Sequence, residues 1–279
     1  MIINNNAVAN NTYNQLQKNQ TQVQKSMEKL SSGLRINKAG DDAAGLAISE
    51  KMRSQIRGLD QATRNAQDGI SLIQTAEGGL AVGQDMLQRV KELAVQASSE
   101  TYDASDTKNI QAEIDELLTE IDKTAGNMDF NGKKLLDGTA DIKIAVGANA
   151  ESLDITIGSM KTDDLGDDTN KLSSFKTGGA NEVTDRDSAQ LLVASVEEAI
   201  KGVSSERASL GAKQNRMEYT IQNLQTTSEN LQSAESRIRD ADVAKEMVKV
   251  SKNQILQQAS QAMLVQANQS PQQVLQLLR

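Results

Sequence analysis

The sequence predicts a mainly α-helical protein whose N- and C-terminal halves pair as a long antiparallel coiled-coil rod, with a small β-hairpin and a short loop in the middle. Apolar residues recur at alternating spacings of three and four in both halves, as in helices that bury one face. Aromatic residues make up 2% of the chain and Trp is absent, so aliphatic side chains must form the core. Residues 1–17 and 253–278 contain no Asp, Glu, Lys or Arg, which suits both ends to burial.

Each end carries a heptad-like seam. The N-terminal series, in a helix expected over about residues 4–34, contains Ile2, Ala9, Tyr13, Leu16, Val23, Met27, Leu30 and Leu34. Asn6 and Gln20 fill its polar positions, where they set the register of a coiled coil. The C-terminal series contains Val243, Met247, Val250, Ile255, Ala259 and Ala262. Because one such helix cannot bury its seam alone, we expect the ends to pack against each other and against other copies.

Three more helices are expected between the ends. The first begins at an N-cap, Asp41 or Asp42, reaches about residue 97 and bends at Gly78–Gly79. Its buried series is Ile48, Met52, Leu59, Ala62, Ala66, Ile73, Ala76, Leu80, Leu87, Val90, Ala94 and Ala97. The second is capped by Ser105 or Asp106, and the third covers about residues 187–236. The last helix begins near residue 240, with Pro271 starting a separate final turn.

The pattern becomes β-like after residue 126. Residues 129–132 predict a tight turn, and apolar residues then alternate with polar ones over 142–146 and 153–157, as in a hairpin. Residues 160–187 are polar and acidic, which predicts a solvated surface loop. The expected domains are an inner core of 1–40 and 240–279, an outer helical core of 41–140 and 187–239, and a hairpin and loop of 141–186.

Composition excludes several classes of function. The net charge of −8 argues against nucleic-acid binding, and the mean hydropathy of −0.51 argues against membrane insertion. The absence of His and Cys removes the common nucleophile and zinc systems, so we expect no enzyme, no cofactor and no metal. Asp41–Asp42 fits an N-cap better than an acid/base pair, and the Asp163–Asp168 cluster lacks the spacing of a calcium loop. The N-terminus lacks a Sec-type signal, so secretion would need an uncleaved route.

Long strings of residues in both halves identify the chain as resembling bacterial flagellin. In the N-terminal half they lie at residues 27–37, 39–48, 68–78 and 130–132, which include MEKLSSGLRIN and DGISLIQTAEG. In the C-terminal half they lie at residues 209–216, 236–242 and 272–279. The likeness covers roughly residues 1–140 and 187–279.

The resemblance implies the structural subunit of the extracellular flagellar filament, which self-assembles for motility. Such subunits are exported unfolded through the flagellar type III apparatus and add at the distal tip, where their disordered ends become ordered. The implied partners are other copies of the chain, an export chaperone, and the cap and hook-junction proteins. The short middle implies that a large outer domain is missing.

Particular positions match functional sites of the family. Gln88, Arg89, Leu93 and Glu113 match positions that contact the Toll-like receptor for flagellin. Val274, Leu275, Leu277 and Leu278 match a region read by the export chaperone and by inflammasome sensors. We expect Arg89 and its neighbours to serve subunit contact first, although a simple ion pair of Arg89 with Glu92 or Glu113 is an alternative. Ser and Thr side chains of residues 159–188 are open to O-glycosylation.

Two other functions stay open on the sequence alone. One is the junction protein between hook and filament, which shares the terminal pattern more weakly. The other is a cytosolic coiled-coil signalling hairpin, although its ends would not need to be neutral. A flagellin with a protease insert is excluded by the missing His residues and the short middle.

Overall fold

The computed structural model describes residues 6–148, 151–166, 170–179 and 181–277, without the side chains of residue 104 and residues 270–277. Over these residues the chain forms five α-helices, one short 3-10 helix and four short strands, which confirms the predicted fold class. It divides into two compact units. A terminal unit consists of Met1–Ile56 and Glu229–Arg279, and a central unit consists of Arg57–Ser228. The division thus falls at residues 56 and 229, where boundaries at 40 and 240 were expected.

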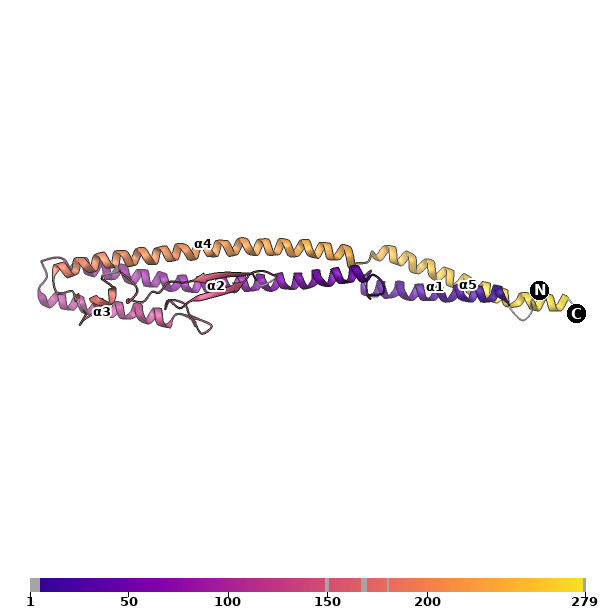
Figure 1. The fold of residues 1–279 in the computed structure, drawn as a ribbon, viewed down its shortest axis with the longest axis horizontal. Coiled ribbons are helices and arrows are strands. Elements are labelled where there is room, and N and C mark those ends of the chain that lie inside the picture. The colour runs from indigo at the N-terminus through magenta and orange to yellow at the C-terminus, as the bar shows by residue number, and fades with distance from the viewer. Residues whose placement is uncertain (1–5, 149–150, 167–169, 180, 278–279) are drawn as a thin grey trace. The chain divides into compact units, whose positions relative to one another are not determined.

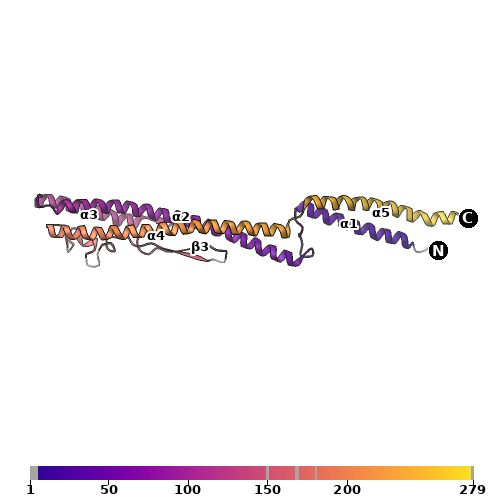
Figure 2. The same ribbon diagram turned by 90° about the horizontal axis from the view of Figure 1, so that it is seen from above.

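The terminal unit is built on α1 (Ala7–Ser32) and α5 (Val243–Leu277), which lie side by side and antiparallel (Figures 1 and 2). Asn6 caps the start of α1 by accepting a hydrogen bond from the backbone N–H of Ala9. Gly33 ends the helix with a φ of 70°, a left-handed conformation that favours glycine. The paired ends agree with the sequence prediction.

Helix α5 continues through Pro271 to Leu277 without interruption. The prediction that Pro271 starts a separate turn is therefore wrong. Proline removes one backbone donor from a helix, but its fixed φ is compatible with helical geometry, so the backbone on either side remains helical.

The segments that connect these helices to the rest of the terminal unit are paired with each other. Leu34 and Asp240 form an isolated antiparallel bridge, and the N–H of Arg35 donates to the carbonyl of Arg239 at 2.7 Å. Helix α2 (Ala43–Ala97) then begins at Asp42, whose carboxylate accepts from the N–H of Gly45 at 2.9 Å. Asp42 is therefore the N-cap, whereas the Asp41 carboxylate accepts from the N–H groups of Asn37 and Lys38 in the preceding turn.

The central unit contains most of α2, together with α3 (Ala104–Asn127) and most of α4 (Arg186–Arg239), which run alongside one another (Figure 1). The predicted α2 series is buried from Leu59 to Ala97. One detail of α2 differs from the prediction, because Ile48 is 49% exposed; the helix includes Gly78–Gly79, and a bend there stays a prediction. The cap of α3 is Asp103 and not Ser105 or Asp106.

Two short hairpins follow α3. Strands β1 (Asp129–Phe130) and β2 (Lys133–Lys134) are joined by Asn131 and Gly132, whose φ values of 51° and 77° are those of a tight two-residue turn. Strands β3 (Asp141–Ala145) and β4 (Ser152–Thr156) pair antiparallel, with Ile142 opposite Ile155. Their inward side chains are buried and alternate with exposed ones, as predicted.

The segment after β4 is packed, which corrects the prediction of a solvated loop. It contains the 3-10 helix η1 (Leu172–Phe175). Its apolar residues belong to the core of the central unit: Met160, Leu165, Leu172, Phe175 and Val183. Thr162 is 1% exposed, so its hydroxyl is inaccessible to glycosylation in this fold. These apolar residues are irregularly spaced within an acidic segment, so no periodic pattern indicated their burial.

Candidate assembly interface

The face of α1 that meets α5 is half polar. Its less exposed residues follow one series of three and four: Ala9, Thr12, Leu16, Asn19, Val23, Ser26 and Leu30. The two buried residues of this helix are Asn19 and Ser26, both polar. Because a buried hydroxyl or amide gains little on leaving water, this seam binds more weakly than an aliphatic one.

The facing side of α5 is similar. Its less exposed residues are Glu246, Val250, Asn253, Gln257, Ser260, Leu264 and Ala267. Together with the series on α1 they form what we call the inner seam. Two polar contacts cross it: the Asn19 amide donates to the Ser260 hydroxyl at 3.1 Å, and the Asn6 amide donates to the Ala267 carbonyl at 2.8 Å. These two hydrogen bonds specify which residues of α1 and α5 lie opposite each other, which the repeating pattern of the seam alone does not specify.

Glu246 is the one acidic residue of the inner seam. A hydrogen bond from Lys249 at 2.8 Å holds the pKa of Glu246 below its usual value, so the buried carboxylate stays ionised at neutral pH. The Ser26 hydroxyl is directed toward this carboxylate but has no hydrogen bond of normal geometry. A buried hydroxyl left in this state costs about 1–3 kcal/mol.

The predicted N-terminal seam is half correct. Ala9, Leu16, Val23 and Leu30 lie in the inner seam, whereas Tyr13 and Met27 are 48% and 47% exposed. The reason is a shift of one residue: Thr12 and Ser26 face α5 where the aliphatic pattern predicts Tyr13 and Met27. Aliphatic periodicity alone could not distinguish the two, because polar residues fill the true positions.

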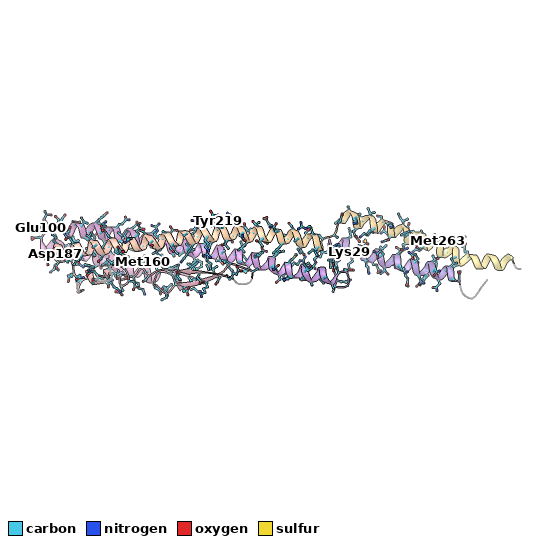
Figure 3. All side chains as sticks on the ribbon, turned by 45° about the horizontal axis from the view of Figure 1, so that its top comes forward. Lys29, Glu100, Met160, Asp187, Tyr219 and Met263 are labelled. Carbon is cyan, nitrogen blue, oxygen red and sulfur yellow. The ribbon has the colours of Figure 1, made fainter. Side chains whose placement is uncertain are left out.

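Ile255, Ala259 and Ala262 of the predicted C-terminal series are exposed and do not contact α1, so their burial in an assembly core stays a prediction. At about 100° per residue they share a face with Val248 and Met263, directed away from α1. We call these five residues the outer face of α5. Val248, Ile255 and Met263 are 68%, 65% and 63% exposed, and Met263 is labelled in Figure 3. A shallow groove of about 480 Å³ runs beside Val248, Ile255 and Leu256.

The remaining predicted terminal residues have no described side chains. Ile2 and Leu278 lie outside the described residues, whereas Val274, Leu275 and Leu277 belong to α5 by their backbone alone. Their part in an assembly core stays a prediction.

A second predicted group lies in the central unit. Arg89 donates to Glu113 at 2.9 Å and to Glu92 at 3.1 Å, and the bond with Glu113 raises the pKa of Arg89 further. Gln88 is exposed beside this cluster. Leu93, in contrast, is 2% exposed and packs in the core, so the expectation that it contacts a receptor directly is wrong for this fold. It lies on the buried stripe of α2, as its spacing from Leu87 and Val90 indicates.

Sequence reasoning missed a polar clamp on α3. Gln111 is buried, donates to the Phe175 carbonyl at 2.7 Å and accepts from the N–H of Val183 at 3.0 Å. Burial raises the pKa of Asp122, but hydrogen bonds from Lys176 and Thr162 outweigh it and hold that pKa below its ordinary value. The clamp explains why the segment after β4 lies against the helices. The one signal for this contact in the sequence is that Gln111 and Asp122 are spaced to lie on the same face of α3.

Ion pairs also hold the ends of α2 and α4 that belong to the terminal unit. Arg53 pairs with Glu235 at 2.9 Å, and Arg239 pairs with Glu50 at 2.7 Å. These links join the start of α2 to the end of α4 within the terminal unit. Over the described residues, no helix has the length and apolar character to cross a membrane, and no cluster of His, Cys, Asp or Glu is arranged to hold a metal.

Comparison with known proteins identifies the family. A model of the bacterial flagellin N-terminal helical region matches residues 3–141, and one of the C-terminal helical region matches residues 193–278. The chain is 55% identical over 281 residues to a flagellin of Halalkalibacterium halodurans and 54% identical over 306 residues to a flagellin of Bacillus subtilis, each alignment covering 100% of both chains. A putative flagellar hook-associated protein from Vibrio parahaemolyticus shares the fold alone, with a TM-score of 0.59 and 10% identity over 72% of this chain and 100% of that one. This chain therefore belongs to the bacterial flagellin family, the structural subunits of flagellar filaments.

Proposed function

We propose that copies of this chain polymerise through the outer face of α5. The observation that carries the proposal is the exposure of Val248, Ile255 and Met263 on the side of α5 that α1 does not cover. Burial of such apolar surface gives about 25 cal/mol per Å². A contact of this kind that repeats between copies without closing generates an open helical filament.

The charge distribution supports a second copy of this chain as the occupant of that face. Residues 253–278 contain no charged side chain, and neither do residues 1–17. An ionised group enclosed among helices would cost several kcal/mol unless paired. Uncharged ends with apolar outer residues therefore suit the interior of a polymer.

The proposal includes the route by which the filament grows outside the cell. The chain is exported unfolded through the flagellar type III apparatus with the help of a chaperone. It adds at the distal tip beneath a cap, on a base of hook-junction proteins, and its ends become ordered as they join. The support is family membership together with the weak inner seam, which disfavours stable pairing of α1 and α5 before assembly.

A further part of the proposal is recognition by a host. The exposed Gln88, Arg89 and Glu113 form a polar surface for a Toll-like receptor, while the buried Leu93 supports that surface from beneath. The C-terminal Val274–Leu278 segment is the expected contact of inflammasome sensors. Binding of the purified chain to a Toll-like receptor ectodomain and to an inflammasome sensor tests these roles.

The experiment for polymerisation compares two substitutions at one position. Ile255→Asp places a carboxylate on the outer face, whereas Ile255→Val keeps it apolar. In seeded growth from filament fragments, we expect Ile255→Asp to raise the critical concentration at least about a hundredfold, because a buried unpaired charge costs several kcal/mol. Ile255→Val should stay within about tenfold of the wild type. Equal growth of the aspartate variant would contradict the proposal.

The hook–filament junction protein makes a different prediction. A junction protein is present in few copies at one end of a filament, whereas a main subunit forms its whole length. The abundance of this chain in sheared filaments therefore decides between them. The flagellins that match this chain over its full length at 55% and 54% identity favour the main subunit.

A further inference from the structure

Asn6 uses both ends of its side-chain amide. Its oxygen accepts from the N–H of Ala9 at 3.1 Å and caps α1. Its nitrogen donates to the backbone carbonyl of Ala267 at 2.8 Å, within α5 and 261 residues away in sequence. One side chain thus defines where α1 begins and which turn of α5 lies beside it.

The Ala267 carbonyl is available for a chemical reason. In an α-helix each carbonyl accepts from the N–H four residues later, and the residue four after Ala267 is Pro271, the single proline of the chain. Proline has no N–H, so the helix leaves this carbonyl without its usual donor. Ala267 is 9% exposed, and an unsatisfied carbonyl there would cost about 1–3 kcal/mol.

We propose that Pro271 and Asn6 form a register lock between the two ends of the chain. Pro271 frees one carbonyl at one turn of α5, and Asn6 satisfies it only when α1 and α5 pair in the observed register. The inference rests on the proposed polymerisation, because the register decides how the outer face of α5 is offered to neighbouring copies.

A lock is needed because the inner seam specifies its register weakly. Its residues repeat at three and four along both helices and alternate between aliphatic and small polar side chains. A slip of one heptad would preserve much of this pattern, as in other heptad-based pairs. Upstream of the last turn of α5, whose carbonyls lack donors as at any helix end, every other residue retains its N–H, so over this part of the helix only the turn at Ala267 rewards Asn6 in this way.

The test is a substitution whose two effects have opposite signs. Pro271→Ala removes a residue that costs about 3 kcal/mol in helix interiors, so α5 alone should become more helical. It also restores the N–H that satisfies the Ala267 carbonyl, so Asn6 gains less from docking there. Because the gain in helix propensity lowers the critical concentration for seeded growth and the lost contact raises it, the lock is measured by the effect of an Asn6 substitution with and without Pro271→Ala.

Two further variants isolate the lock. Asn6→Asp keeps a good N-cap but removes the donor, and should raise the critical concentration by about tenfold or more relative to Asn10→Asp, which adds the same charge at an exposed position of α1. Asn268→Ala increases helix propensity at an exposed position of α5 without removing either partner of the Asn6 hydrogen bond, and should change growth less than about twofold. When Pro271→Ala is already present, Asn6→Asp should lose most of its effect, because both changes weaken the same interaction, the hydrogen bond from Asn6 to the Ala267 carbonyl.

The outcomes separate the lock from the filament proposal. Additive effects of the two changes in the double variant would overturn the lock while leaving polymerisation intact. If Pro271→Ala cannot be purified, a wild-type critical concentration for Asn6→Asp would overturn it as well. Failure of the wild-type chain to extend seeds would contradict polymerisation itself, and the lock with it.

Discussion

Gly69 on α2 is a point of close contact among three elements, and its replacement gives a sharp prediction. A Cβ added at Gly69 would overlap Cδ1 of Ile144 on β3 and lie 2.8 Å from Cε of Met217 on α4. Met217 is fully buried and Ile144 is 9% exposed, so the ends of both side chains must shift within the core to admit the new methyl group. Gly78, nine residues along the same helix, has no atom within 4 Å of the added Cβ.

The two positions share a helix but differ in packing. Replacing glycine by alanine gains about 1 kcal/mol of helix propensity at either position. At Gly69 overpacking costs about 1–3 kcal/mol, so Gly69→Ala should be neutral to about 2 kcal/mol destabilising, while Gly78→Ala should be stabilising. Urea unfolding of the free subunit at an unchanged slope measures both. If Gly69→Ala stabilises the chain as much as Gly78→Ala, the close packing described for α2 is wrong.

Three further predictions concern the central unit. Arg89→Glu should impair filament formation while changing stability by less than about 1 kcal/mol, because surface pairs contribute little; normal motility, or rescue by a matching Glu113→Arg change, would refute a role in subunit contact. Gln111→Ala should destabilise by about 2–4 kcal/mol in urea unfolding, because two buried backbone groups lose their partner; a loss below about 0.5 kcal/mol would contradict the clamp. The pKa of Asp122 is lowered on folding, so its contribution to stability is present above the ordinary carboxyl pKa and is lost as pH falls below about 4. Asp122→Asn should therefore flatten the loss of unfolding free energy between about pH 5 and about pH 3, and an unchanged acid profile would contradict the Lys176 pairing.

The helices of the central unit could be predicted from sequence because their pattern is aliphatic and uninterrupted. The predicted series on α2 is buried from Leu59 to Ala97, and the buried residues of α4 from Leu192 to Leu224 follow the same aliphatic spacing. The hairpin of β3 and β4 was equally clear from alternation. The packing of the segment containing Phe175 could not be predicted in this way. Its contacts are with Gln111 and Asp122, on a helix distant in sequence, and the periodicity of a single sequence carries no information about such contacts.

The terminal interface could be predicted only in part, because α5 has two faces that suit packing, the inner seam and the outer face, whereas a single apolar series predicts one. Aliphatic spacing correctly indicated Leu16 and Val23, but the inner seam also uses Asn19 and Ser260. The apolar series with Ile255 belongs to the outer face. Hydrophobic periodicity identifies the face that needs covering, and it does not say whether the same chain or another copy covers it.

The central claim is that the outer face of α5 becomes buried between copies. The chain contains no cysteine, so an Ile255→Cys variant carries one thiol at the middle of this face. We predict that a maleimide labels it readily in the free subunit and about tenfold or more slowly in assembled filaments, where reaction requires local opening. Equal labelling rates in subunits and filaments would contradict the account.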